Sequence, residues 1–353
     1  MNADRVTLGI TLLLTKISTL TCAFSIPAGP GKPLNFRQSE WDDYTAAHAG
    51  KWRGIWTTYD AAGNQQGDSD RMDTTIELSP DGETLRHVNV LHVGSVGSEC
   101  STCFDSVETR EIPVGVFTKG TFRERVSGAV YLNGPGVTRR GDVNIEVGVR
   151  NGDRRMRCIV THRPQLDGVL PPSQLVLERI IVVSETSSVK EGIGPTVGSL
   201  WSHFEKPRWL GIWRGRNMIL DACSDIGGGD GENKLAWREE VWPPSHLRRC
   251  RCSGDTRDDS HALLEFDGGV RVEAPSVILG GEAAEMTISL PVDGIETGYS
   301  SRIVHAKMRF EVLSRIIDEK VEGGDTYNIR ISAPKLLRFD VADLEYVRST
   351  GLT

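Results

Sequence analysis

The chain has 353 residues, 38% of them hydrophobic, with a formal net charge of −7 and seven cysteines. This length predicts two domains, and the cysteines are too few for a disulfide scaffold. No apolar run reaches the roughly 18 residues that a membrane-spanning helix needs. The acidic balance argues against a nucleic-acid-binding protein, which would carry an excess of Lys and Arg.

Residues 1–38 have the composition of a targeting segment. Arg5 precedes the apolar stretch Val6–Ala23, which ends in small residues, as in a signal peptide. The sequence around Phe24 resembles the bipartite plastid-targeting signals of algae with secondary plastids, in which Phe follows the cleavage site and a basic transit region comes next. We therefore expect a plastid location, with secretion as the alternative, and no transmembrane span in the mature protein.

Two short helices are expected, each just before a Gly-x-Trp sequence. Ser39–Ala49, with Ser39 as the N-cap, and Val197–Glu205 are the segments with helical periodicity. No comparable pattern stands out elsewhere, so we expect the rest of each half to consist mainly of strands.

A tryptophan motif is repeated in the chain. Trp52-Arg53-Gly54-Ile55-Trp56 recurs in the second half as Trp209-Leu210-Gly211-Ile212-Trp213. A repeat over so long a distance predicts duplicated domains. Residues 186–198 are rich in Ser, Thr and Gly, which is typical of a linker. We therefore place the first domain at residues 39–185 and the second at 199–353.

Strand patterns dominate both halves. Val143–Val149 alternates apolar and polar residues, Asn151-Gly152 provides a turn, and Met156–Val160 alternates again, which together predict a hairpin. A second hairpin turn is predicted at Ser79–Gly82. Many strands joined by Gly- and Asn-rich turns predict an all-β fold of two tandem antiparallel up-and-down β-barrels. Further strands are expected at Val270–Glu273, Met286–Leu290 and Val304–Val312.

The Gly-x-Trp sequence that opens each half resembles the signature of the lipocalin-like (calycin) barrels. The resemblance implies a basic side chain late in each barrel that lies across the Trp ring, a cation–π contact of about 0.5–2 kcal/mol. It implies Arg179 as the partner of Trp56. For Trp213 it implies Arg348, with Arg330 as the alternative.

A narrower resemblance concerns the first half. Trp52–Trp56, Gly152–Arg157 (GDRRMR) and Leu175–Arg179 (LVLER) are similar to the domain-of-unknown-function 3598 family, a two-barrel family of cyanobacteria and algae. The second half matches mainly through Trp209–Trp213. The family is related in fold to the barrels that attach bilins to phycobiliproteins, but no lyase motif carries over.

The candidate site residues fall into two groups. Cys100 and Cys103 have the spacing of a redox pair or half of a metal site, with plain thiols or a loop disulfide as the alternative. No metal site is predicted, because the acidic run at residues 225–232 fails the EF-hand spacing. The other group either lines a ligand cavity or closes the barrels as core residues: Trp52, Trp56, Arg179, Trp209, Trp213 and Arg348.

An eight-stranded barrel can hold one small ligand. We therefore expect a binding protein for a small hydrophobic molecule, such as a tetrapyrrole, a carotenoid or a fatty acyl chain; beyond a bound pigment no cofactor is expected. One alternative is a pigment-modifying lyase or isomerase that uses the same cavity. Another is an assembly factor for a photosynthetic complex. The sequence assigns no catalytic residue.

Overall fold

The computed structural model describes only part of the chain. The described residues are 38–93, 109–138, 141–165, 174–187, 212–222, 235–241, 261–266, 269–292, 302–312, 319–320, 327–328 and 334–347. Several predictions lie outside them: the targeting segment up to residue 37, nearly all of the linker, the second helix, Cys100, Cys103, Trp209, Arg330 and Arg348. The backbone of Trp213 is described, but its side chain is not.

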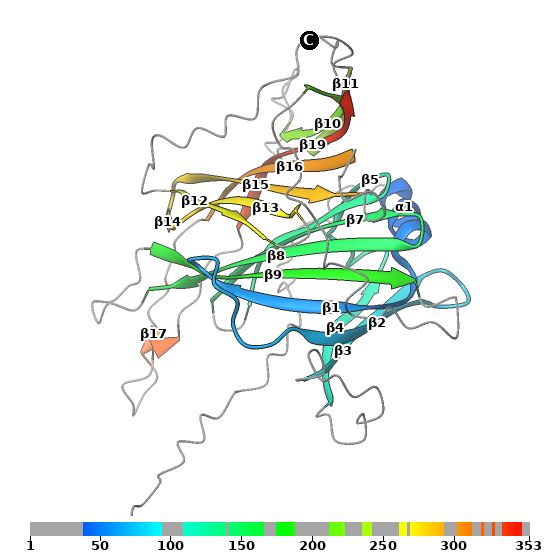
Figure 1. Ribbon diagram of the computed structural model, residues 1–353, viewed down its shortest axis with the longest axis horizontal. Helices are drawn as coiled ribbons and strands as arrows, with labels where there is room; N and C mark the ends of the chain where they lie inside the picture. Colours follow the sequence, from blue (N-terminus) through cyan, green and yellow to red (C-terminus); the bar gives the residue numbers. More distant parts are fainter. Residues whose placement is uncertain are drawn as a thin grey trace, which may run out of the picture.

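The first sheet begins directly after α1 (Gln38–His48) and is antiparallel (Figure 1). Its strands pair in the order β4-β3-β2-β1-β9-β8-β7-β6-β5, and β14 pairs with β9. The bounds are β1 (Gly50–Asp60), β2 (Asp70–Leu78), β3 (Thr84–His92), β4 (Thr109–Thr118), β5 (Arg125–Ser127), β6 (Val130–Val137), β7 (Val143–Asn151), β8 (Arg154–Pro164), β9 (Gln174–Ser187) and β14 (Val277–Leu279).

The second sheet pairs in the order β11-β10-β19-β16-β15-β13-β12, and β17 pairs with β18 apart from it. The bounds are β10 (Ile212–Ala222), β11 (Leu235–Val241), β12 (His261–Glu265), β13 (Arg271–Pro275), β15 (Ala283–Pro291), β16 (Arg302–Glu311), β17 (Glu319–Lys320), β18 (Tyr327–Asn328) and β19 (Lys335–Val347).

The two sheets repeat one topology. In each, the first strand along the chain (β1 or β10) pairs with the last (β9 or β19), and the preceding strands follow in antiparallel order. The predicted all-β, antiparallel fold is confirmed. Within the described residues, no ladder closes either sheet, so β4 and β5 are the edges of the first sheet. The division into two domains and the closed barrels stay predictions.

Local sequence signals placed several elements correctly. The Asn151-Gly152 hairpin joins β7 to β8, and Gly152 has φ +60°. The turn at Ser79–Gly82 joins β2 to β3. The first helix is also present, but it begins at Gln38, so Ser39 lies within the helix and is not its N-cap. Trp41, Tyr44 and His48 share its buried face because they are three and four residues apart.

The second sheet packs against one face of the first. Met156, Cys158 and Val160 of β8 lie in one buried cluster with Ile288 and Val304 of β15 and β16. Figure 1 shows β13 and β15 next to β8, and β15 is in contact with β8. Hydrogen bonds join the two sheets as well: the Leu177 amide donates to the Ser276 carbonyl oxygen (2.9 Å), and the Asn151 amide nitrogen to that of Val292 (2.9 Å).

The other face of the first sheet, here called the inner face, curls upon itself. One buried cluster joins Ile76 and Leu85 of β2 and β3 with Val126 and Tyr131 of β5 and β6, although these pairs belong to opposite ends of the strand order. The same cluster contains Trp41 and Tyr44 of α1, so the helix covers one end of the curled sheet. The inner face is therefore enclosed.

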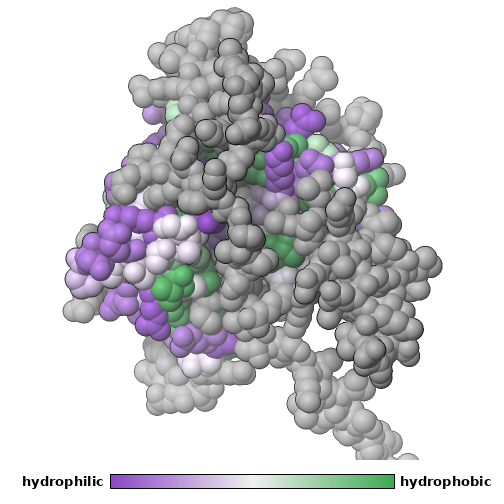
Figure 2. Space-filling model, turned by 180° about the vertical axis from the view of Figure 1, so that it is seen from behind, coloured by the Kyte–Doolittle hydropathy of each residue, from purple (hydrophilic) through white to green (hydrophobic). Residues whose placement is uncertain are grey.

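On the face drawn in Figure 2, coloured hydrophobic residues form small separate areas among hydrophilic ones. No helix in the described ranges combines the length and apolarity needed to cross a bilayer.

Candidate functional site

The inner face of the first sheet carries three layers of side chains, which follow one another along β2. Met72, Thr74 and Ile76 occupy successive inner positions of this strand, and each belongs to a different layer. The apolar layer consists of Trp56, Met72, Leu91, Ile112, Ile159, Ile181 and Val183; the charged layer of Thr74, Asn89, Glu146, Arg155, Arg157 and Glu185; and the aromatic layer, next to α1, of Trp41, Tyr44, Phe122 and Tyr131 with Ile76 and Leu85.

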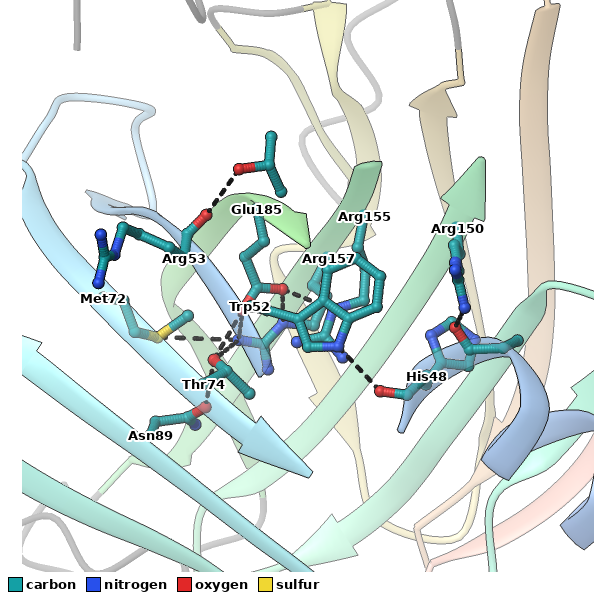
Figure 3. Close-up of polar contacts among 12 residues, drawn as sticks. His48, Trp52, Arg53, Met72, Thr74, Asn89, Arg150, Arg155, Arg157 and Glu185 are labelled. Atoms are coloured by element: carbon teal, nitrogen blue, oxygen red, sulfur yellow. Dashed lines mark hydrogen bonds and ion pairs between the residues drawn. The ribbon is translucent and has the colours of Figure 1, made fainter. Parts of the chain in front are cut away.

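Glu185 is the centre of the charged layer (Figure 3). It receives hydrogen bonds from Arg155 Nε (2.6 Å), from Arg157 Nε and Nη2 (3.0 and 3.1 Å), and from the Thr74 hydroxyl (2.7 Å). Arg157 Nη1 lies 3.3 Å from Glu146 Oε1. The side chains of Arg155 and Glu185 are 0% exposed. The ion pair of Arg155 with Glu185 is therefore fully removed from water.

The environment shifts the pKa of Glu185 and the pKa of the adjoining Tyr131 in opposite directions. Burial by itself would raise the pKa of Glu185, but Arg155 and Arg157 outweigh it and lower that pKa to about 2. Burial and the neighbouring Glu146 raise the pKa of Tyr131 well above its usual value, and the Tyr131 hydroxyl donates to Glu146 at 2.6 Å. At neutral pH, Glu185 is thus a carboxylate and Tyr131 is a neutral donor.

Trp52 connects the charged layer to α1. The Arg155 guanidinium carbon lies 4.4 Å from the centroid of its indole ring, and that of Arg150 lies 5.3 Å away. The indole nitrogen donates to the His48 carbonyl oxygen at 2.9 Å, at the end of the helix. The Trp52 side chain is therefore held at both its ring face and its nitrogen (Figure 3).

Two terminal nitrogens in this layer have no hydrogen-bond partner. Arg155 Nη1 and Nη2 are buried and meet no acceptor within the described part of the chain. His87 Nε2, on the inner face of β3, is in the same situation. Buried polar atoms without partners are rare in native proteins, and each one calls for an explanation such as a bound ligand or water.

The predicted pairing of Trp56 with Arg179 is not seen. The ladder between β1 and β9 places Trp56 opposite Val183 and Arg179 opposite Asp60, four positions further along. Among the described residues, the tryptophan of this motif that stacks with arginines is Trp52. Trp56 instead is part of the apolar layer, and its indole nitrogen donates to the Thr58 hydroxyl at 3.1 Å.

The charged layer was not predicted from the sequence. Arg155 and Arg157 belong to the GDRRMR segment on which the family resemblance rests. From the sequence, this segment predicted only the strand that follows the hairpin turn. A usable signal was the pair Arg155 and Arg157, two positions apart among the apolar residues of β8. Glu146 on β7 and Glu185 on β9 are the carboxylates on the neighbouring strands.

Other chemistry finds little support in the described residues. No group of three or more His, Cys, Asp or Glu there could hold a metal ion. Cys158 is a free, buried thiol whose pKa is raised by burial and by Glu146, so it is a poor nucleophile.

Glu124 gives a prediction on stability. Burial, outweighing the backbone amides that bind its carboxylate, raises its pKa to about 7 from 4.5. From pH 4.5 to 7 the folded state then holds a proton that the unfolded state has lost, so Glu124 makes the free energy of unfolding fall as pH rises, by roughly 3 kcal/mol in all.

The substitution Glu124→Gln tests this shift, because it removes the titrating group but keeps an acceptor for the Arg123 amide (3.1 Å). Urea unfolding should find the variant more stable than the wild type at pH 8 and similar to it at pH 4.5. Parallel pH profiles of the two proteins would contradict the shift.

The structure thus defines an all-β protein with two repeated antiparallel sheets and a charged interior in the first. Residues 37–170 match the N-terminal domain model of the DUF3598 family, a domain of unknown function. The resemblance to this family is therefore confirmed over residues 37–170, which include β1 to β8. No curated protein matches the sequence.

Comparison with solved structures gives distant neighbours. A protein of unknown function from the DUF3598 family of Nostoc punctiforme shares 12% identity; the match covers 88% of this chain and 100% of the other, with a TM-score of 0.45. MucB in complex with MucA(peri) shares 12% identity over 87% and 94%, with a TM-score of 0.16. A putative AttH of Nitrosomonas europaea shares 10% over 91% and 99%, with a TM-score of 0.14.

Proposed function

We propose that the protein binds a small amphiphilic molecule within the enclosed inner face of the first sheet. The single observation that carries the proposal is the charged layer: Arg155, Arg157, Glu146 and Glu185 are buried between an apolar and an aromatic layer. Ligand sites typically combine apolar lining with a few converging polar groups.

Stability alone gives no reason for this arrangement. Moving an ion pair out of water costs several kcal/mol for each ion, and well-packed apolar residues of similar volume are often as stable or more so. A core built only for packing would continue the apolar residues of Met72 and Val183 towards α1. The charged layer is better accounted for by a polar group that it binds.

The proposed function is tested on the full-length protein by native mass spectrometry after gentle purification from its own cells. We expect one small molecule per chain, which is lost on denaturation and identified by its mass. A thermal-shift assay with palmitate, biliverdin and β-carotene provides the second readout, because a ligand at 100 times its Kd stabilises the folded state by about 2.7 kcal/mol. A protein that carries no molecule and is stabilised by none of the three probes would overturn the proposal.

A further inference from the structure

The guanidinium of Arg155 has a hydrogen-bond partner on one side only. Its Nε donates to Glu185 at 2.6 Å, and its carbon lies 4.4 Å from the ring centroid of Trp52. A stacked ring takes up the face of a guanidinium but not its edge, from which the N–H groups point outward. The edge formed by Nη1 and Nη2 meets no acceptor within the described residues, although the side chain is 0% exposed.

The two neighbouring arginines on the same face differ from Arg155 in this respect. Arg157 uses Nε and Nη2 on Glu185 and Nη1 on Glu146. Arg150 uses Nε on the carbonyl oxygen of Gly152, and Nη1 on those of Ala46 and Ala47 at the end of α1. Arg155 therefore stands out within an otherwise well-paired group.

The charge around Arg155 favours an anion. Its carboxylate partner, Glu185, is shared with Arg157, and Arg150 adds a third positive charge beside Trp52. His87 Nε2, a further nitrogen that meets no acceptor in the described part of the chain, belongs to the same inner face. Two parallel N–H groups on a planar guanidinium match the two oxygens of a carboxylate, which they bind in a bidentate manner.

We infer that Arg155, through Nη1 and Nη2, binds the carboxylate of an amphiphilic ligand, while Trp52 holds the guanidinium in place. This inference rests on the proposed function and narrows it to ligands with an acid group. Long-chain fatty acids and tetrapyrroles with propionate side chains have this chemistry. Carotenoid hydrocarbons do not.

The test compares acids with their neutral esters. Palmitate with methyl palmitate, and biliverdin with its dimethyl ester, are titrated into the full-length protein while tryptophan fluorescence is recorded; β-carotene serves as the probe without an acid group. A hydrogen bond to a charged group makes the acid of the correct pair bind about 10–100-fold more tightly than its ester. The pair that shows the preference identifies the source of the carboxylate.

Arg155→Lys is the decisive variant, because it keeps a positive charge beside Glu185 but removes the planar pair of N–H groups. We expect its preference for the acid to fall below about 3-fold, while the ester binds as it does to the wild type. Arg150→Lys is the matched control: the Arg150 guanidinium also lies near Trp52, but its Nε and Nη1 donate to carbonyl oxygens, so the preference should persist. Circular dichroism confirms that both variants fold.

The outcomes separate this inference from the proposed function. Equal binding of acid and ester, equally tight binding of β-carotene, or an undiminished preference in Arg155→Lys would overturn the carboxylate site and leave a binding protein. A protein that binds none of the five probes would overturn the carboxylate site, and if it also carries no molecule in native mass spectrometry, the proposed function is overturned as well.

Discussion

Glu185→Gln is expected to lower the free energy of unfolding by about 3–5 kcal/mol, the usual cost of removing one partner from a buried ion pair. The substitution removes the charge that Arg155 and Arg157 share, at 2.6 and 3.0 Å, and leaves Arg155 without its carboxylate partner and Arg157 with Glu146 alone. Domains are commonly stable by only 5–15 kcal/mol, so a large part of the total would be lost. Urea unfolding of the wild type and the variant at pH 7 measures the difference.

Acid provides a second readout for the same residue. The pKa of Glu185 is lowered from 4.5 to about 2, so its contribution to stability is fully present above pH 4.5 and is lost as pH falls towards 2. The difference between the wild type and Glu185→Gln should therefore shrink over this interval. Glu178→Gln is the control on the same strand, since its partner Arg163 is 44% exposed and a pair of this kind contributes at most about 1 kcal/mol. Equal losses in the two variants would show that the charged layer is not closed to water.

The features that sequence predicted correctly are those set by neighbouring residues. The β7–β8 hairpin follows from Asn151-Gly152 between two alternating segments, and Gly152 adopts the positive φ that such a turn requires. The tryptophan repeat predicted duplicated domains, and this division stays a prediction. The structure shows two antiparallel sheets with a shared strand order, in which β1 pairs with β9 as β10 pairs with β19.

The features that it could not predict depend on contacts between distant residues. Alternation in β8 shows that Arg155 and Arg157 share a face, but not whether that face meets water. It is buried because the sheet curls and α1 covers its end. Glu185, at the centre of the charged layer, is 28 residues from Arg157 and 111 residues from Thr74 in the sequence. No spacing rule joins positions so far apart.

The tryptophan–arginine contact illustrates the same limit. The expectation that a guanidinium lies on an indole of the motif was sound chemistry, and Arg155 on Trp52 provides that contact. The expected pair, Trp56 and Arg179, depended on the register between β1 and β9. In that register, Arg179 lies opposite Asp60, four positions along β1 from Trp56. The packing of the whole sheet determines the register.

Gly54→Ala is expected to be among the most disruptive single substitutions in the first sheet. A β-carbon at Gly54 would lie 1.9 Å from the Ser184 carbonyl oxygen and 2.7 Å from Glu185 Cγ, distances that no side chain tolerates. β1 and β9 would have to separate at the residue that holds the charged layer together. We expect a loss of more than about 3 kcal/mol, in the range typical of severe strain or disrupted buried networks.

Gly120→Ala is the control for Gly54→Ala. A β-carbon at Gly120 would meet only the Thr118 hydroxyl, at 3.8 Å, so a change below about 1 kcal/mol is expected in urea unfolding. Gly215 extends the comparison to the second sheet, where a β-carbon would lie 1.7 Å from the Asp343 carbonyl oxygen between β10 and β19. In both sheets a glycine thus allows the first strand to approach the last. If Gly54→Ala were as stable as Gly120→Ala, the glycine of the motif would have some role other than this close approach, and the link between the motif and the charged layer would fail.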